Sequence, residues 1–162
     1  MSLAQKLEDQ PTICQIYVGL MAQTELLTEA DLGQNFFDAI PSGNFEKVYV
    51  SKSKTSFSEQ SATSRAGDSF IQRLRISMPI SSYKRAEKIR HLMKAKFLLI
   101  ELSNKRFLFL GQNDEQQNKK ISVRYTADER NANFEFTNRS IFPMGYAFLE
   151  GYGFPYLIPS TI

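Results

Sequence analysis

The chain has 162 residues, a formal net charge of +3 and 42% hydrophobic residues. This length predicts one domain over residues 1–162, and the hydrophobic content excludes a chain that is disordered throughout. Thirteen Phe and seven Tyr without any Trp favour β structure, because aromatic side chains fit the pleated surface of a sheet. One Cys and one His exclude an internal disulfide and a zinc site of Cys and His ligands within one chain. The small net charge alone gives no argument for nucleic acid.

The N-terminal third of the sequence predicts two strands. The segment between them has two possible interpretations, a helix or an extended segment. Residues 12–21 alternate as in a strand, with Ile16 and Val18 on the same side. A Thr followed by acids resembles a helix start in residues 28–40, and an extended conformation over residues 24–40 is an open alternative. Residues 45–53 predict the next strand. The start of the chain lacks the regions of a secretory signal, and no apolar run is long enough to cross a membrane. We therefore expect an intracellular site of synthesis and no membrane partner.

A polar loop or arm over residues 51–67 follows. It is rich in Ser, Thr and charged residues, and Phe57 is its lone large apolar side chain. Such a segment cannot bury enough apolar area to fold alone. Two interpretations stay open: a flexible loop, or an arm or long hairpin that orders against a neighbouring subunit.

The middle of the chain predicts a long strand and then the principal helix. Residues 69–79 alternate between a mostly apolar face and a face with two arginines. After Pro79, Ser81 or Ser82 can cap a helix over residues 82–96. The apolar face of this helix is expected to pack on the sheet, and it consists of Ala86, Ile89, Leu92 and Met93.

The densest apolar stretch predicts a hairpin. Residues 97–102 and 106–110 read as two strands joined by a short polar connection. Both strands are apolar on both faces, so we expect them in the centre of a sheet, with the helix on one side and a second layer on the other. Two further alternating strands are predicted over residues 121–127 and 132–138.

Residues 141–162 predict an extended aromatic segment. Three prolines and three glycines interrupt any regular element, whereas the many aromatic side chains are too apolar to remain in water. The segment must dock on its own domain or on a neighbouring chain, and we favour a strap that binds a neighbour.

The sequence carries no catalytic signature, so we expect a protein that is not an enzyme and that has no metal or organic cofactor. His91 falls on the charged face of the predicted helix and is expected to be solvated. The acids show no spacing that would pair two carboxylates, and no glycine-rich stretch has the pattern of a phosphate loop.

Basic residues concentrate between residues 84 and 106. Eight Lys and Arg occur there with only Glu87 and Glu101 as acids. Such a surface can bind phosphate in a salt-dependent way, although a charge run is usually a solvated face. A nucleic-acid-binding module that uses the helix at residues 82–96, with non-specific DNA contact, is the alternative function. Phosphate contacts would come from Lys84, Lys88 and Lys94.

The order of these elements resembles the small β-sandwich-plus-helix proteins that build the tail tubes, tail terminators and neck rings of tailed bacteriophages. It is most similar to the neck and tail ring proteins of crAss-like and related phages. The resemblance rests on the strand "SFIQRLRISMP", which ends at a proline, then the helix, then the hairpin "FLLIELSNKRFLFLG". It covers roughly residues 67–140 and is one of pattern, without an invariant motif. The first 45 residues and the aromatic C-terminus lie outside it.

Together these features predict a mainly β (α+β) fold, a β-sandwich of antiparallel strands with one principal helix packed on it and an extended arm. The resemblance implies a structural virion component that forms a homomeric ring at the head–tail junction or in the tail. Its partners would be copies of itself and other phage head–tail or tail proteins, and its location would be the virion. Ring closure needs two different complementary patches on one chain. We assign these to the arm and the C-terminal segment, with the interface residues Phe57, Arg65, Tyr146, Phe148, Tyr152, Phe154 and Tyr156.

Overall fold

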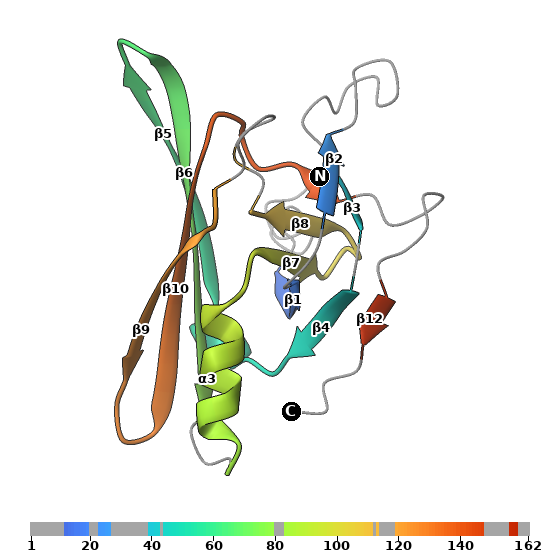
Figure 1. Cartoon of the computed structure of the whole chain (residues 1–162), viewed down its shortest axis with the longest axis vertical. Coiled ribbons are helices and arrows are strands. Elements are labelled where there is room, and N and C mark those ends of the chain that lie inside the picture. The colour runs from blue at the N-terminus through green and yellow to red at the C-terminus, as the bar shows by residue number, and fades with distance from the viewer. Residues whose placement is uncertain are drawn as a thin grey trace, which may run out of the picture.

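The computed structural model of this chain describes residues 12–19, 23–26, 39–42, 44–79, 83–111, 113, 119–147 and 156–158. The described strands form two sheets, here named sheet A and sheet B, with one α-helix beside them (Figure 1). The prediction of a mainly β, sandwich-like fold with one principal helix is confirmed.

Sheet A is the larger of the two sheets. Its strands are β1 (Ile13–Gly19), β2 (Gln23–Leu26), β3 (Ala39–Ser42), β4 (Asn44–Val48), β7 (Phe97–Leu102), β8 (Phe107–Leu110), β11 (Tyr146–Ala147) and β12 (Tyr156–Ile158). They lie in the order β12-β4-β1-β7-β8-β11-β3-β2. The central strands β4, β1, β7 and β8 pair antiparallel. At the flanks, β12 pairs parallel with β4, and β11 pairs parallel with β3.

Sheet B has four antiparallel strands in the order β5-β6-β10-β9. They are β5 (Ser56–Ser64), β6 (Gly67–Pro79), β9 (Ser122–Ala127) and β10 (Asn131–Ser140). Burial alternates along β10: every second residue from Ala132 to Ser140 is buried, and the residues between them are at least partly exposed. This period of two means that one face of sheet B packs inward against sheet A and the other is turned to solvent.

The main core lies between the two sheets. It joins Leu98 and Ile100 of β7 to Leu74 of β6, Phe136 of β10 and Leu92 of the helix. Phe97 and Leu99 point to the opposite face of β7 and belong to a second cluster with Phe45 and Phe109. The prediction that both faces of the central hairpin are buried is correct. The expected placement is wrong, since the helix and sheet B contact the same face of β7.

The helix is α3 (Arg85–Met93), which is shorter than the predicted range of residues 82–96. Its cap residue is Lys84, without a side-chain cap, and Ser81 and Ser82 lie outside the described residues. Leu92 is buried and Ile89 packs against the core, but Ala86 is exposed and Met93 is 36% exposed. One residue turns a helix by about 100°. The contacting stripe is therefore too narrow to include Ala86 and Met93.

Local backbone geometry fixes the central hairpin. Leu102 and Arg106 are joined by a backbone hydrogen bond of 2.9 Å, and Lys105 between them has a φ of +61°. This is the geometry of a three-residue hairpin connection whose last residue is left-handed. Gly111, directly after β8, has a φ of +127°, which L side chains rarely adopt.

Several predictions for the N-terminal third agree with the structure only in part. The strand predicted over residues 45–53 ends at Val48, and a 3-10 turn, η1 (Lys52–Lys54), follows it. Of the extended alternative over residues 24–40, residues 24–26 belong to β2 and residues 39 and 40 to β3. The rest of that range, and with it most of the predicted helix, lies outside the described residues.

Candidate assembly surface

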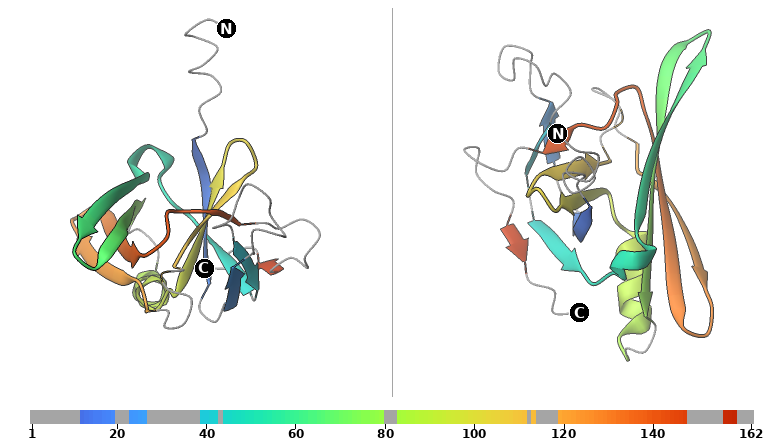
Figure 2. Two further views of the ribbon diagram at one scale, coloured as in Figure 1. Left: turned by 90° about the horizontal axis from the view of Figure 1, so that it is seen from above. Right: turned by 180° about the vertical axis from the view of Figure 1, so that it is seen from behind.

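The turn end of the β5–β6 hairpin projects beyond the region where the two sheets pack together (Figures 1 and 2). Residues 58–68 are all exposed, whereas Leu74 near the other end of β6 is buried in the core. Ser64 lies opposite Gly67, so the hairpin closes with a two-residue turn that contains Arg65. The polar segment thus forms a hairpin within the chain, and its ordering against a neighbouring subunit stays a prediction.

Strand β5 forms an edge of sheet B. Its nine residues include no Lys, Arg or Pro, which are residues that commonly protect an edge from pairing with another chain. Its one charged side chain, Glu59, is exposed and lies on the same side of the sheet as Gln72. There the Glu59 Oε2 accepts hydrogen bonds from Nε2 of Gln72 at 2.9 Å and from the backbone N–H of Met144 at 2.6 Å. Among the described residues, no strand pairs with the outer edge of β5.

A chain of buried amides fixes the base of the hairpin. Gln72 and Asn138 lie opposite each other on β6 and β10 and are 2% and 1% exposed. Nδ2 of Asn138 donates to Oε1 of Gln72 at 2.8 Å, and Nδ2 of Asn113 donates to Oδ1 of Asn138 at 3.1 Å. Buried amides are expensive to leave unpaired. This network therefore holds β5, β6 and β10 in one arrangement.

Strand β9 forms the other edge of sheet B, and it runs opposite to β5 because three antiparallel pairings separate the two strands. Copies of sheet B placed side by side around an axis along the strands would bring Ser56–Ser58 of β5 in one copy level with Ser122–Arg124 of β9 in the next. The two strands would meet as an antiparallel pair. A contact between two different edges is heterologous, which is the kind of contact that closes into rings.

An open hollow of about 790 Å³ lies at the base of the hairpin. Partly buried side chains of Ile13, Phe57 and Leu108 line it. Phe57 therefore packs against its own core and also borders an open apolar surface. Its role at an interface stays a prediction.

The other predicted interface residues fall into three groups. Arg65 is exposed at the tip of the hairpin. Tyr146 and Tyr156 lie on β11 and β12, which pair with β8 and β4 of the same chain. The remaining residues lie outside the described part of the chain, and they are Phe148, Tyr152 and Phe154. Where residues 141–162 are described, they therefore dock on their own domain, contrary to the strap between chains that we favoured from the sequence.

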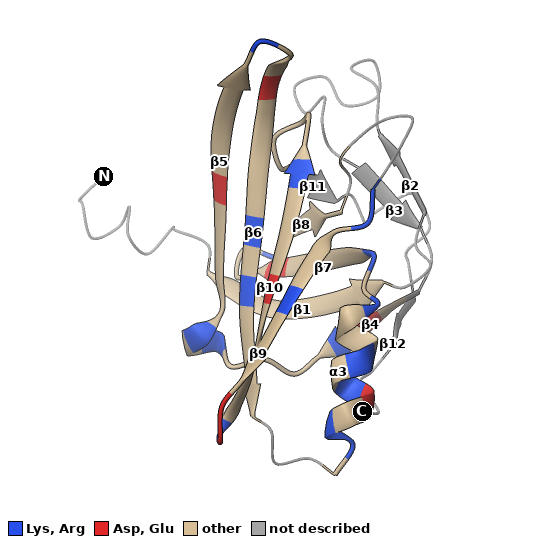
Figure 3. Cartoon of the chain, turned by 60° about the vertical axis from the view of Figure 1, so that its left-hand side comes forward, with Lys and Arg blue, Asp and Glu red and all other residues tan. Residues whose placement is uncertain are grey.

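The predicted basic cluster does not form one face. The ammonium group of Lys84 lies 5.9 Å from the ring centre of Tyr83. Lys88 faces β4, and Lys94 is exposed at the end of the helix. Two further basic residues of the cluster, Lys105 and Arg106, lie beyond the far end of β7, at the turn to β8. Figure 3 shows the basic residues spread over α3 and over strands of sheet B.

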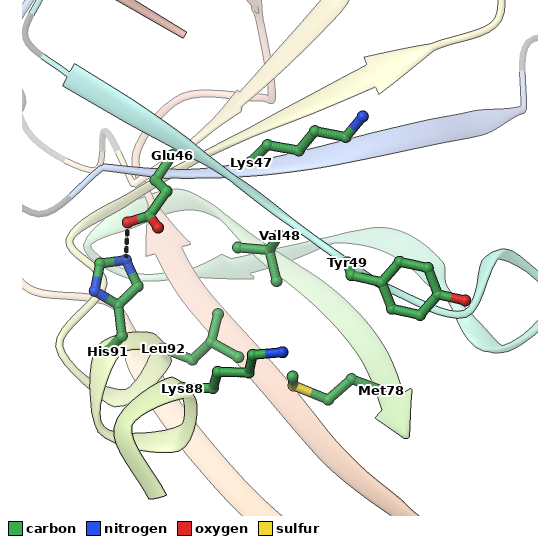
Figure 4. Close-up of a pocket in the computed structure, with 8 residues that line it drawn as sticks. All are labelled: Glu46, Lys47, Val48, Tyr49, Met78, Lys88, His91 and Leu92. Carbon is green, nitrogen blue, oxygen red and sulfur yellow. Dashed lines mark ion pairs between the residues drawn. The ribbon is translucent and has the colours of Figure 1, made fainter. Parts of the chain in front are cut away.

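His91 was expected to be solvated, and this prediction is wrong. Its Nε2 lies 2.9 Å from Oε2 of Glu46, and the two side chains are 20% and 21% exposed. Figure 4 shows the pair at one end of a hollow that Val48, Met78 and Lys88 also line. The volume of this hollow is only about 20 Å³, which is room for a water-sized group and far below that of a metabolite site. The pair therefore joins α3 to β4 and does not form a substrate pocket.

A second partly buried polar contact lies on sheet A. Oη of Tyr17 donates to Oε2 of Glu101 at 3.0 Å. Burial, this hydrogen bond and the charge of Glu101 raise the pKa of Tyr17 to about 12. The Tyr17 phenol therefore stays protonated at neutral pH, and its hydrogen bond joins β1 to β7. In the described residues, no group of three or more His, Cys, Asp and Glu side chains could hold a metal ion.

Comparisons with protein families, with curated proteins and with solved structures find no match for this chain. Among the described residues, no helix has the length and apolar character needed to span a membrane.

Proposed function

We propose that this chain is a structural subunit of a tailed-phage virion that assembles with copies of itself into a ring at the head–tail junction or in the tail. The observation that carries the proposal is the outer edge of β5, which no described strand pairs and which has no Lys, Arg or Pro, on a hairpin that projects from the body. An edge strand that is left unpaired presents its N–H and C=O groups to another chain. The order of strand, helix and hairpin, which resembles tail and neck ring proteins, is further support.

The ring would use the two edges of sheet B. β5 of one subunit would pair with β9 of the next, and the hollow beside Phe57 would widen the contact. The buried amides at the base of the hairpin support this geometry, because a rigid edge loses less conformational freedom on pairing. No residue in this scheme has a catalytic role.

Native mass spectrometry and negative-stain imaging of the purified protein test the ring directly, and we expect one closed species of several subunits. The variant Ser58→Lys/Ala62→Lys places two charges on β5, and Ser122→Lys/Thr126→Lys does the same on β9. All four positions are exposed. Each variant should be a folded monomer, because charged side chains block edge pairing.

Mixing the two variants sharpens this test. Each variant keeps one intact edge, so an equal mixture should form a one-to-one dimer and no ring. Ala86→Lys/Glu87→Gln is the matched control, since it raises the net charge by the same two units at exposed positions of α3, away from both edges. The control should form wild-type rings. Rings from either edge variant alone, or a mixture that stays monomeric, would disprove pairing between β5 and β9.

A further inference from the structure

The outward face of sheet B gathers arginines that are distant in the sequence. Glu135 of β10 lies opposite Arg75 of β6 on one side and opposite Arg124 of β9 on the other. Arg73, two residues from Arg75, shares this face because side chains alternate along a strand. Arg139 of β10 has the same parity as Glu135. The described strands thus present four arginines and one glutamate on this face.

The glutamate does not neutralise this surface. Nε of Arg75 lies 2.7 Å from Oε2 of Glu135. This hydrogen bond and the charges of Arg75, Arg73 and Arg124 keep the pKa of Glu135 below its usual value. The carboxylate therefore stays ionised and binds one guanidinium edge. The Arg75 side chain remains 65% exposed, and Arg124 is exposed as well.

A hollow of about 330 Å³ is set into the same face. Its cationic lining comes from three elements: Lys54 of η1, Arg75 of β6 and Arg124 of β9. Thr126 and Asn133 add uncharged hydrogen-bonding groups. An anion in this hollow would lie near three cationic side chains and one carboxylate, that of Glu135. This is the composition that recognises a phosphate group.

The spacing of the arginines indicates a chain of phosphates and not a single one. Residues two apart on a strand are separated by about 7 Å, and strands two apart in a sheet by about 10 Å. Arg73 is not part of the lining of the hollow, so a phosphate bound in the hollow leaves Arg73 to contact a neighbouring phosphate. No aromatic side chain belongs to the outward set of the described strands, so the face offers no platform on which a base could stack.

We infer that the outward face of sheet B binds the phosphate backbone of a nucleic acid without reading its sequence. The contacts come from Arg73, Arg75 and Arg124, with Lys54 at the rim of the hollow. This assigns the polyanion surface to the sheet and not to α3, on which the basic residues point in different directions. The inference goes beyond the proposed ring and does not depend on it.

Fluorescence anisotropy with a labelled single-stranded oligonucleotide of 20 nucleotides tests this assignment. Three or four phosphate contacts predict that affinity falls by about 20- to 50-fold between 50 and 200 mM salt, from a slope of about −0.7 per neutralised phosphate. Arg73→Gln/Arg124→Gln removes two contacts and leaves the Arg75–Glu135 pair intact. This variant should weaken binding by about 10-fold or more at 50 mM salt and lower the slope by about 1.4.

Arg90→Gln/Lys94→Gln is the matched control, since it removes the same charge from exposed positions of α3. We expect less than about a twofold change from it. Equal weakening by both variants, weakening by the α3 variant alone, or no binding by the wild type at 50 mM salt would overturn the inference. So would inorganic phosphate that competes with the oligonucleotide at an equal concentration of phosphate groups. Thermal unfolding and native mass of each variant must match the wild type, and Arg73→Lys/Arg124→Lys, which keeps the charge, should retain most of the affinity.

Discussion

Gly111 offers a quantitative test of how β8 ends. A methyl group at this position would lie 2.7 Å from the backbone oxygen of Lys96 and 2.7 Å from Cδ1 of Phe97, on a backbone with φ of +127°. Gly67 supplies the comparison, because it also has a positive φ, +115°, but has nothing within 4 Å of such a methyl group. Backbone strain should destabilise both alanine variants by about 1–3 kcal/mol. Overpacking should add about 1–3 kcal/mol at Gly111 alone.

Urea unfolding monitored by circular dichroism measures this difference. Gly111→Ala should unfold at a lower urea concentration than Gly67→Ala, with the same dependence of free energy on urea. For a chain of this size, each kcal/mol shifts Tm by about 2–4 °C, so the two Tm values should differ by about 2–12 °C. Equal stability of the two variants, or greater loss in Gly67→Ala, would refute the close approach of Gly111 to the start of β7.

Three further predictions concern the helix, Tyr17 and the C-terminus. Leu92→Ala should lower the free energy of unfolding by about 2–5 kcal/mol because Leu92 is 2% exposed. Ala86→Ser, on the exposed side of the helix, should change the free energy of unfolding by less than about 0.5 kcal/mol. Similar losses for both variants in urea unfolding would contradict the described helix face. The raised pKa of Tyr17 means that its stabilising contribution is complete below pH 10 and is lost as the pH rises through about 12. An ultraviolet titration should show one tyrosine that ionises late, and this step should vanish in Tyr17→Phe. Deletion of residues 142–162 should lower the Tm of the monomer, since β11 and β12 pair with β8 and β4 of the same chain; an unchanged Tm with loss of oligomers would favour a strap between chains.

The sequence predicted most strands because alternation reports burial directly. Ile16 and Val18 of β1 are buried, as are Leu74 and Ile76 of β6, and in each strand the pattern places the buried pair on one face. Local composition also identified the turn between β7 and β8. These features depend on neighbours within a few residues, so a single sequence contains them.

The partners of each strand could not be predicted in the same way. The contact of His91 with Glu46 joins residues 45 positions apart, and only the packing of α3 beside β4 brings them together. Likewise, two arginines on one face of β6 were visible in the sequence. The third, Arg124, became a neighbour only through the pairing of β9 with β10. The apolar stripe of α3 was overestimated because periodicity does not show how much of a helix a sheet can cover.

The position of β1 between β4 and β7 has a consequence during synthesis. Ile16 of β1 lies opposite Ile100 of β7, a separation of 84 residues. Ribosomes add about 5–20 residues per second, so β1 waits roughly 4–17 s for this neighbour after it has been made. During that interval only the β4 side of β1 can be paired, and its other edge remains accessible to the translation machinery and to chaperones. A strand in the middle of a sheet is thus among the last to be enclosed when its neighbour is encoded late, and slow decoding between β4 and β7 would lengthen its exposure.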